Sequence, residues 1–359
     1  MNSKKLLLIA GWNIAFLLLF MGAIELVLGN WLKPKPAASQ IPNASYGKHL
    51  KWNAQEIYRS STPVLISYTR DQQDYRNFNP VHRGNRILTI GGSTTDQRFV
   101  SDGETWQDEL ERLNPTSNVI NGGVDGQSAL GHLFAIKNWH AIELKDKQIS
   151  KVVFYFGIND LRLLALQDTS STSKEQSQAK APTIKELISQ NSFWLKTIRK
   201  SLSGHRLPPT SQNFLSKHGS AFESFLPLKK GEPQSITKEH QSSVYQEIIQ
   251  QLALQSHQTF PTAEIIFVQQ QIPGCHFLSP VKVIDRHPHT RGVNQRYCQQ
   301  LGQVYLVQDQ ALRSLPGTWR PRVLKMYLNQ YITDQGVYDA VHTNATGSKQ
   351  IANYLDSNL

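Results

Sequence analysis

The sequence predicts an α/β domain whose parallel sheet is covered by helices on both faces, preceded by one N-terminal transmembrane helix. Short β-rich runs alternate along the chain with stretches of helical periodicity, which is typical of a parallel sheet with helical crossovers. Several of these runs lead directly into glycine-rich turns, and functional sites of parallel sheets form at such strand ends. The N-terminal run is apolar and long enough to cross about 30 Å of hydrocarbon.

The apolar run extends from Leu6 to Leu28, and Asn13 and Glu25 are its polar exceptions. A cleaved signal peptide is the main alternative to an anchor, but its apolar region would be shorter and followed by a small-x-small site. Residues 29–35 do not offer such a site. We therefore expect residues 1–32 to be a membrane anchor.

The orientation of the anchor follows from its flanking charges and from the large domain behind it. Lys4 and Lys5 lie in a five-residue head, which favours a cytoplasmic N-terminus, although Lys33 and Lys35 nearly balance them. A large domain is translocated largely regardless of its own charge. We expect a single-pass protein of the inner (plasma) membrane, with residues 36 onward on the periplasmic, extracytoplasmic side.

The sequence predicts that the rest of the chain consists of one linker and one large domain. Residues 33–47 contain three prolines among small and polar residues and form an extended tether. The domain then spans residues 48–359, with an insert at about 161–235. Within the insert, residues 168–180 are polar without apolar periodicity, and residues 183–202 predict an amphipathic helix. That helix either packs on the domain or serves as a lid or membrane-surface helix.

The elements of the domain follow from periodicity. The expected strands are Arg86–Ile90, Asn118–Asn121, Lys151–Phe156, Glu264–Gln269 and Val304–Val307. The expected helices are Thr105–Leu113, Ser128–Leu144, Ser242–Leu254 and Thr346–Leu355.

Composition excludes several classes of protein. The mean hydropathy of −0.41 excludes a polytopic membrane protein. Two cysteines in 359 residues exclude a disulfide-stapled scaffold and any four-cysteine zinc or iron–sulfur centre. The net charge of +11 suits an acidic polysaccharide, an anionic membrane surface or nucleic acid. Because a translocated domain does not meet nucleic acid, we expect no nucleic-acid partner.

The strand ending at Ile90 runs into Gly91-Gly92-Ser93-Thr94-Thr95, a turn that can expose one hydroxyl at the start of a helix. A serine there is well placed as a nucleophile, since its own N–H and the helix N-terminus face developing negative charge. A plain tight turn or a phosphate cradle is the alternative. The Walker lysine is absent and the GxGxxG spacing is not met, which disfavours nucleotide binding.

Three further segments could complete such a site. Asn118–Ser128 is again a strand that leads into a glycine turn, and Phe156-Gly157-Ile158-Asn159-Asp160 ends the next strand. Together they place a backbone N–H and an amide side chain at neighbouring strand ends, as an oxyanion hole requires. Near the C-terminus, Asp339 precedes His342 by three residues, so its carboxylate can bond one imidazole nitrogen and leave the other facing a serine. A lone surface or core histidine is the alternative.

The order GGSTT, NGGVDGQS, FGIND and DAVH resembles the four blocks of the SGNH, or GDSL-type, hydrolases, and specifically a membrane-anchored bacterial branch with GGSTT in block one. The resemblance covers about residues 68–160 and 330–355, including Tyr68-Thr69-Arg70-Asp71. It implies a three-layer α/β/α sandwich with a five-stranded parallel sheet. One departure is Gly92, which stands where the GDSL motif has Asp.

The resemblance also implies a role for each site residue. Ser93 would be the nucleophile and would supply one oxyanion donor through its N–H, while Gly126 would supply the second N–H. The side-chain amide of Asn159 would be the third donor. His342 would be the base and Asp339 its orienting acid, with no cofactor and no metal.

The expected activity is that of an extracytoplasmic serine esterase that removes short O-acyl groups, chiefly acetyl, from cell-envelope or exopolysaccharide. An O-acyltransferase with the same triad is the first alternative, and a non-catalytic glycan-binding or scaffold protein is the second. The expected partners are the acylated glycan, the membrane through the N-terminal helix, and proteins of envelope biosynthesis.

Cys275 and Cys298 lie 23 positions apart, and in an oxidising compartment they are expected to form a disulfide. Two free buried thiols are one alternative. A zinc site with His276, His287 and His289 is another, but His287-Pro288-His289 lacks the usual His-x₃₋₅-His spacing.

Overall fold

A computed structural model describes residues 3–29, 49–76, 84–165, 192, 194–195, 197–198, 238–284, 295–328 and 331–359. The chain divides into two compact units, one of Met1–Lys35 with Lys174–Leu207 and one of Pro36–Ser173 with Pro208–Leu359. The predicted linker at 33–47 lies outside the described residues, and so does most of the predicted insert at 161–235.

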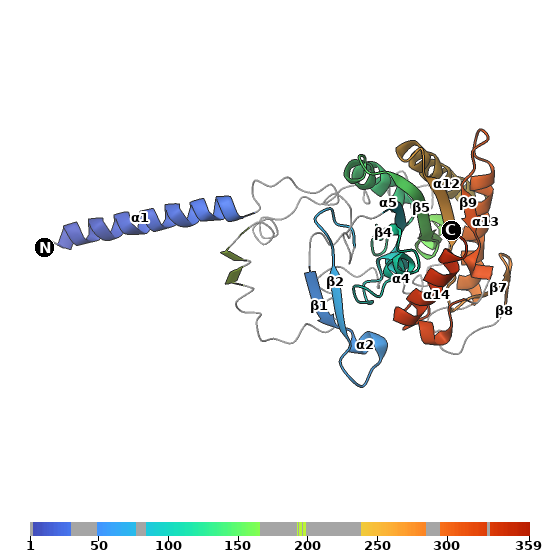
Figure 1. The fold of residues 1–359 in the computed structure, drawn as a ribbon, viewed down its shortest axis with the longest axis horizontal. Helices are drawn as coiled ribbons and strands as arrows, with labels where there is room; N and C mark the ends of the chain where they lie inside the picture. Colours follow the sequence, from blue (N-terminus) through green and yellow to red (C-terminus); the bar gives the residue numbers. More distant parts are fainter. Residues whose placement is uncertain are drawn as a thin grey trace. The chain divides into compact units, whose positions relative to one another are not determined.

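The first unit contains helix α1, Ser3–Leu28 (Figure 1). Its window Gly11–Leu28 has a mean hydropathy of 1.9 and no buried residue. Among the described residues it is the one helix long and apolar enough to cross a membrane, a test that an N-terminal signal sequence also passes. Within this unit Trp194 donates its backbone N–H to the Glu25 carboxylate at 3.2 Å and its indole N–H to the Met21 carbonyl at 3.3 Å.

The second unit is built around a five-stranded parallel sheet, which confirms the predicted fold class. The strand order is β4-β3-β5-β6-β9, and neighbouring strands pair in parallel throughout. The bounds are β3 Asn85–Gly91, β4 Ser117–Asn121, β5 Ile149–Phe156, β6 Glu264–Gln269 and β9 Arg322–Leu324.

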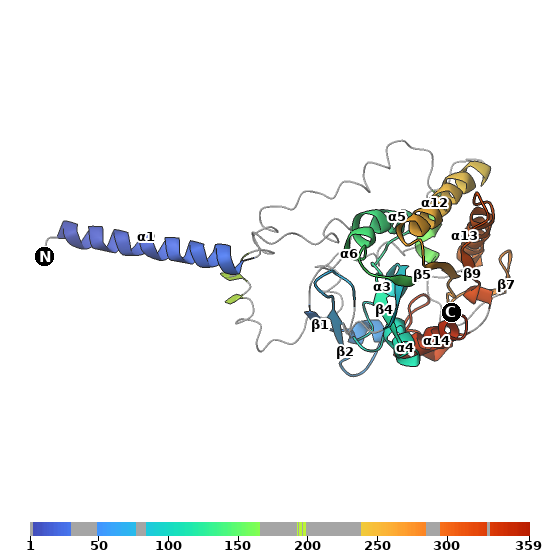
Figure 2. The same ribbon diagram turned by 45° about the horizontal axis from the view of Figure 1, so that its top comes forward.

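Helices cover both faces of the sheet and complete the three layers (Figures 1 and 2). One face carries α5 Ala129–Ala135, α12 Lys238–Thr259 and α13 Gln295–Arg313, and the other carries α4 Trp106–Leu113 and α14 Ala345–Asp356. Alternate residues of one strand feed the two cores. In β5, Val152 and Phe154 join the first core, whereas Val153 and Tyr155 join the second.

The remaining described elements are short. The bounds are α2 Gln55–Tyr58, α3 Ser93–Asp96, the π-helix η2 Ile136–His140, α6 Ala141–Glu143, η3 Ile158–Asp160, α7 Leu161–Ala165, β7 His276–Ser279, β8 Lys282–Ile284, η5 Met326–Leu328 and η6 Asp334–Gly336. The predicted helix Ser128–Leu144 is divided among α5, η2 and α6, which follow one another without a break.

The prediction of a strand at Val304–Val307 is wrong, because these residues lie inside α13. Leu301, Val304 and Tyr305 are fully buried, and Gln308 and Leu312 continue the same face at helical spacing. Four apolar residues are too few to distinguish a strand from one turn of such a face. The fifth strand is instead β9, which has only three residues.

An antiparallel hairpin that the sequence analysis did not predict precedes the sheet. It pairs β1, His49–Asn53, with β2, Leu65–Thr69, in the register His49 opposite Thr69. Trp52 and Tyr68 from the hairpin are fully buried against Phe99 and form a third small core. This core packs on the loop that follows α3.

The structure joins Cys275 and Cys298 in a buried disulfide, with 5.5 Å between their Cα atoms. Of the residues proposed for a zinc site, His287 and His289 lie outside the described residues. No group of three or more His, Cys, Asp or Glu residues suited to a metal ion occurs in the part of the chain that the structure describes.

We predict that reducing this disulfide lowers the free energy of unfolding by about 3 kcal/mol, because the bond constrains a loop of this length in the unfolded chain. Thiol titration of the denatured, unreduced protein isolated from cells is expected to detect no reactive thiol. Two reactive thiols per chain would contradict the pairing and would count against placement in an oxidising compartment.

Candidate active site

The turn that carries Ser93 is formed by two glycines at the end of β3. A Cβ atom on Gly91 would lie 2.0 Å from Thr95 Oγ1 and 2.3 Å from the Tyr155 carbonyl oxygen. A Cβ atom on Gly92 would lie 2.0 Å from Nδ2 of Asn159. A side chain at position 92, where the GDSL motif has Asp, would therefore have to displace the amide of Asn159 from its place in this structure. Ser93 then begins α3.

A compact turn near the C-terminus holds His342 and Asp339. Val337 and Thr343 form an isolated antiparallel bridge, and Tyr338 donates its N–H to the His342 carbonyl at 3.2 Å. The Tyr338 ring also lies parallel to the imidazole, with 5.6 Å between ring centroids. Backbone pairing and ring stacking therefore fix the orientation of the histidine.

Hydrogen bonds connect Asp339, His342 and Ser93 in series. Asp339 Oδ1 accepts the N–H groups of Val341 at 2.8 Å and of His342 at 2.7 Å. Its Oδ2 lies 2.8 Å from His342 Nδ1, and His342 Nε2 lies 2.9 Å from Ser93 Oγ. Because Nδ1 faces a carboxylate, it carries the proton, and Nε2 is left to accept the serine hydroxyl proton.

Burial and charge act in opposite directions on this pair. Burial lowers the pKa of His342, but the Asp339 carboxylate and its hydrogen bond raise it, and the net pKa lies above the ordinary histidine value. Burial raises the pKa of Asp339, but His342 and the two backbone N–H groups lower it, and the net pKa lies below the ordinary value. Asp339 is therefore ionised at neutral pH and stabilises the imidazolium form of His342.

The segments expected to form the oxyanion hole also lie together. The Asn159 amide donates to the Gln127 carbonyl at 2.8 Å and lies against Gly92, next to Ser93. Gly126, which precedes Gln127, has a φ of +75°, a conformation that favours glycine. The structure thus brings Ser93, Asp339 and His342 into hydrogen-bond contact and places Asn159 between the turns of Ser93 and Gly126.

The sequence analysis missed a set of buried charged residues behind these turns. Asp125 immediately precedes Gly126, and its carboxylate lies 3.1 Å from the Arg98 guanidinium. Asp96, the last residue of α3, lies 2.6 Å from Arg70. Arg70 lies within the resemblance to the family. However, it is 26 residues from Asp96 and 55 residues from Asp125, and no rule of sequence spacing connects positions so far apart.

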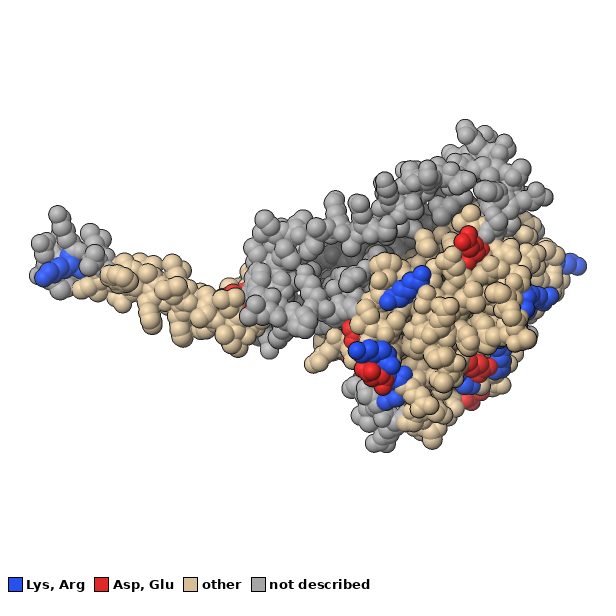
Figure 3. All heavy atoms as spheres, turned by 90° about the horizontal axis from the view of Figure 1, so that it is seen from above, with Lys and Arg blue, Asp and Glu red and all other residues tan. Residues whose placement is uncertain are grey.

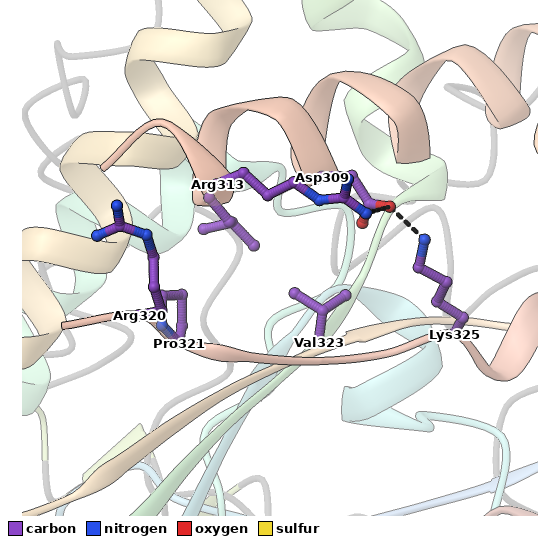
Figure 4. A pocket seen from close by; sticks show the side chains of 7 residues that line it. Asp309, Arg313, Arg320, Pro321, Val323 and Lys325 are labelled. Atoms are coloured by element: carbon purple, nitrogen blue, oxygen red, sulfur yellow. Dashed lines mark hydrogen bonds and ion pairs between the residues drawn. The ribbon is translucent and has the colours of Figure 1, made fainter. Parts of the chain in front are cut away.

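A pocket of about 340 Å³ lies elsewhere, between α13 and the edge strand β9 (Figure 4). None of the five candidate site residues lines it. Its cations are already engaged, since Lys325 and Arg313 pair with Asp309, and Arg320 donates to two backbone carbonyls. We therefore assign no part of the ester chemistry to this pocket.

Comparisons with known proteins place the chain in a family. The family model GDSL-like Lipase/Acylhydrolase matches residues 87–355, well over half of the chain. A search of the curated proteins found no match.

Three solved structures are among those to which the chain is similar. A protein of Bacteroides ovatus described as a GDSL-like lipase is 14% identical, with a TM-score of 0.41, over 76% of this chain and 52% of its own. The match thus spans about half the length of that protein. The Clostridium thermocellum family 3 carbohydrate esterase is 12% identical, with a TM-score of 0.40, over 77% of this chain and 94% of its own. The psychrotrophic esterase EstA of a Pseudoalteromonas species is 12% identical, with a TM-score of 0.37, over 76% and 96%.

The family assignment rests on the family model, and the parallel sheet with its strand-end turns agrees with it. The chain belongs to the GDSL-like lipase and acylhydrolase family, whose members are serine ester hydrolases.

Proposed function

We propose that this protein is a membrane-anchored, extracytoplasmic esterase that removes short O-acyl groups, chiefly acetyl, from cell-envelope or secreted polysaccharide. One observation carries the catalytic part of the proposal. Hydrogen bonds run without a break from Asp339 through His342 to Ser93 in a domain of an ester hydrolase family.

In the proposed acylation step, Ser93 Oγ attacks the carbonyl carbon of the ester while His342 Nε2 takes the hydroxyl proton. The tetrahedral oxyanion accepts hydrogen bonds from the N–H groups of Ser93 and Gly126 and from the Asn159 amide. When the intermediate collapses, the bond to the alcohol breaks and His342 returns the proton to the leaving oxygen. The sugar hydroxyl departs, and the acyl group remains on Ser93.

Deacylation repeats these steps with water as the nucleophile. His342 takes a proton from the water as it attacks the acyl carbonyl, and it returns the proton to Ser93 Oγ when the free acid leaves. Asp339 does not move a proton in this scheme. It holds the imidazole in the tautomer with the proton on Nδ1 and stabilises the imidazolium.

Replacing Asn159 by Ala tests the oxyanion assignment. We expect kcat to fall on the order of 10²- to 10³-fold with little change in KM, because the lost amide acts mainly on the charge that develops in the transition state. Asn138→Ala is the matched control, since that amide, in η2, donates to the Phe134 carbonyl of α5 and makes no contact with the triad. A change in kcat no larger than that of the control would remove Asn159 from the site.

The choice of a glycan substrate follows from access and charge. The turns at the strand ends of the candidate site, Gly91–Thr95, Gly122–Ser128 and Gly157–Asp160, are rich in glycine and polar residues, so we do not expect them to line a channel for a long acyl chain. The net charge of +11 favours an acidic polymer through long-range attraction. Figure 3 shows Lys and Arg interspersed with Asp and Glu on the face that it presents, so this attraction is assigned to the net charge and not to a basic patch on that face.

A series of p-nitrophenyl esters tests the preference for short acyl chains on the full-length protein in detergent. We expect kcat/KM to be highest for acetate and to fall through butyrate to octanoate, and lipid vesicles to leave the rate unchanged. Ser93→Ala supplies the background rate for each ester. If the rate rises toward octanoate, or if vesicles activate the protein, the proposed glycan substrate is wrong and the protein is a lipase.

The natural reaction is tested with an O-acetylated acidic polysaccharide. We expect the wild-type protein to release free acetate in water and Ser93→Ala to release none. If acetyl groups disappear from the donor and appear on an added glycan without release of acetate, the protein is an acyltransferase that uses the same residues.

A further inference from the structure

Residues 49–76 lie before the segment that matches the family model, which begins at residue 87. They form the β1–β2 hairpin and the loop behind it. Two side chains from this loop, Arg70 and Arg76, are each only 3% exposed. Burying two guanidinium groups is costly unless they are fully paired, so their contacts are informative.

Arg70 contacts both turns of the candidate active site. Its Nη2 lies 2.6 Å from the Gly123 carbonyl oxygen, three residues before Gly126, and 2.6 Å from Asp96 Oδ1 at the end of α3. Its Nη1 donates to the Asp74 carbonyl at 2.6 Å, and its Nε lies 2.7 Å from the Tyr68 hydroxyl. One guanidinium thus joins the oxyanion turn to the helix that begins with Ser93.

Arg76 supports the same helix from its C-terminal end. It donates to the carbonyl oxygens of Asp96, Gln97 and Val100. These carbonyls lie at the end and just beyond the end of a four-residue helix that cannot satisfy them internally. The position of Ser93 therefore depends on contacts from a segment that lies before the family-model match.

Arg98 extends this network from Asp96 to Asp125, the residue next to Gly126. Arg98 lies 3.5 Å from Asp96 and 3.1 Å from Asp125. The series Arg70, Asp96, Arg98 and Asp125 is buried throughout and alternates in charge. These ion pairs connect two turns that share no secondary structure.

We propose that Arg70 is a positioning residue for the ester reaction: the hairpin segment uses it to hold the Gly123–Gly126 turn in register with Ser93, so that the Gly126 N–H meets the oxyanion. The inference rests on the proposed function, since it takes Gly126 as an oxyanion donor. It assigns a role in turnover to a segment that lies before the start of the family-model match.

The test compares Arg70→Lys with Arg112→Lys in the full-length protein. A lysine keeps the positive charge beside Asp96 but, as a single point donor, cannot bridge Asp96 and the Gly123 carbonyl. Arg112 is exposed and pairs with Glu109 on α4, which makes it a matched control. Active sites are counted by the burst of a p-nitrophenyl phosphonate, so that turnover is expressed per reactive serine.

We expect kcat per titrated site to fall roughly 10- to 100-fold in Arg70→Lys, with KM within about twofold of wild type, because small misplacements of catalytic groups cost this much. The Arg112→Lys protein should match wild type. A merely structural role for Arg70 would reduce the number of titratable sites or the Tm while leaving turnover per site unchanged, and that result would overturn the inference.

Asp125→Asn provides a second variant if Arg70→Lys does not fold. It keeps the shape of the side chain and removes the ion pair with Arg98. Because the Asp125 carboxylate also raises the pKa of His342, the comparison is made on the alkaline plateau of the pH profile. We expect Asp125→Asn to lower kcat per titrated site and to leave KM unchanged. An unchanged kcat per titrated site would contradict the inference.

A double variant tests whether Arg70 affects turnover through the oxyanion donors. If Arg70 acts through the oxyanion donors, Arg70→Lys should cost less in an Asn159→Ala background than in wild type, because residues that act as a unit are not additive. Fully additive losses would contradict the inference while leaving the esterase intact. A wild-type protein without Ser93-dependent ester turnover would instead overturn the proposed function, and the inference with it.

Discussion

Ser93→Ala and His342→Ala are each expected to lower kcat for p-nitrophenyl acetate on the order of 10⁶-fold, and the double variant is expected to be no slower than either single one. The reason is geometric. His342 Nε2 lies 2.9 Å from Ser93 Oγ, so removing either group ends the same proton transfer and leaves only the oxyanion donors and substrate binding.

Initial rates and circular dichroism on the purified full-length variants check this result together with the fold. Thr94→Ala is the matched control for Ser93. Its hydroxyl is one residue away but donates to Gln270 at 3.0 Å instead of His342, so most of the wild-type rate should remain. A Ser93→Ala protein that kept most of its rate, or a Thr94→Ala protein that lost it, would show that the nucleophile is wrongly assigned.

Asp339→Asn is expected to lower kcat on the order of 10⁴-fold without disturbing the turn. The amide oxygen of an asparagine can still accept the N–H groups of Val341 and His342, which Asp339 Oδ1 accepts in the wild type. What the variant loses is the negative charge beside Nδ1, and with it the preference for the tautomer that leaves Nε2 free to accept a proton.

The pH dependence of kcat/KM provides a second measure of the negative charge of Asp339, because that charge raises the pKa of His342. His342 acts as a base only when neutral, and its pKa is raised in the wild type. Activity should therefore be lost as pH falls through a value above the ordinary histidine pKa of about 6.5. In Asp339→Asn the residual activity should persist to lower pH, because the raising charge is gone. An acid limb that moved to higher pH in the variant would contradict the assignment of Asp339.

Much of the fold and of the candidate site could be predicted from the sequence, because the information is local. Each of the strands β3, β4 and β5 ends in a turn with its own glycine pattern, and the carboxyl ends of neighbouring parallel strands meet at one edge. Asp339 and His342 are three residues apart, so their contact is also local. The catalytic roles of these residues remain predictions until the variants are measured.

The parts that could not be predicted depend on long-range packing. Val304–Val307 has strand composition, and only the burial of Leu301 and Leu312 on the same face shows that it belongs to α13. β9 has three residues, too few for a periodic signal. The contact of Arg70 with the Gly123 carbonyl joins positions 53 residues apart, and no rule of spacing connects them.

The central claim is that Ser93 is the nucleophile of an ester hydrolase, and labelling with a serine-reactive p-nitrophenyl phosphonate followed by peptide mass spectrometry tests it most directly. The account predicts one adduct per chain, located on Ser93, with loss of ester turnover in proportion to labelling and no adduct in Ser93→Ala. An adduct on another residue that accompanied the loss of activity, or full ester turnover in a protein that carries the label on Ser93, would contradict it.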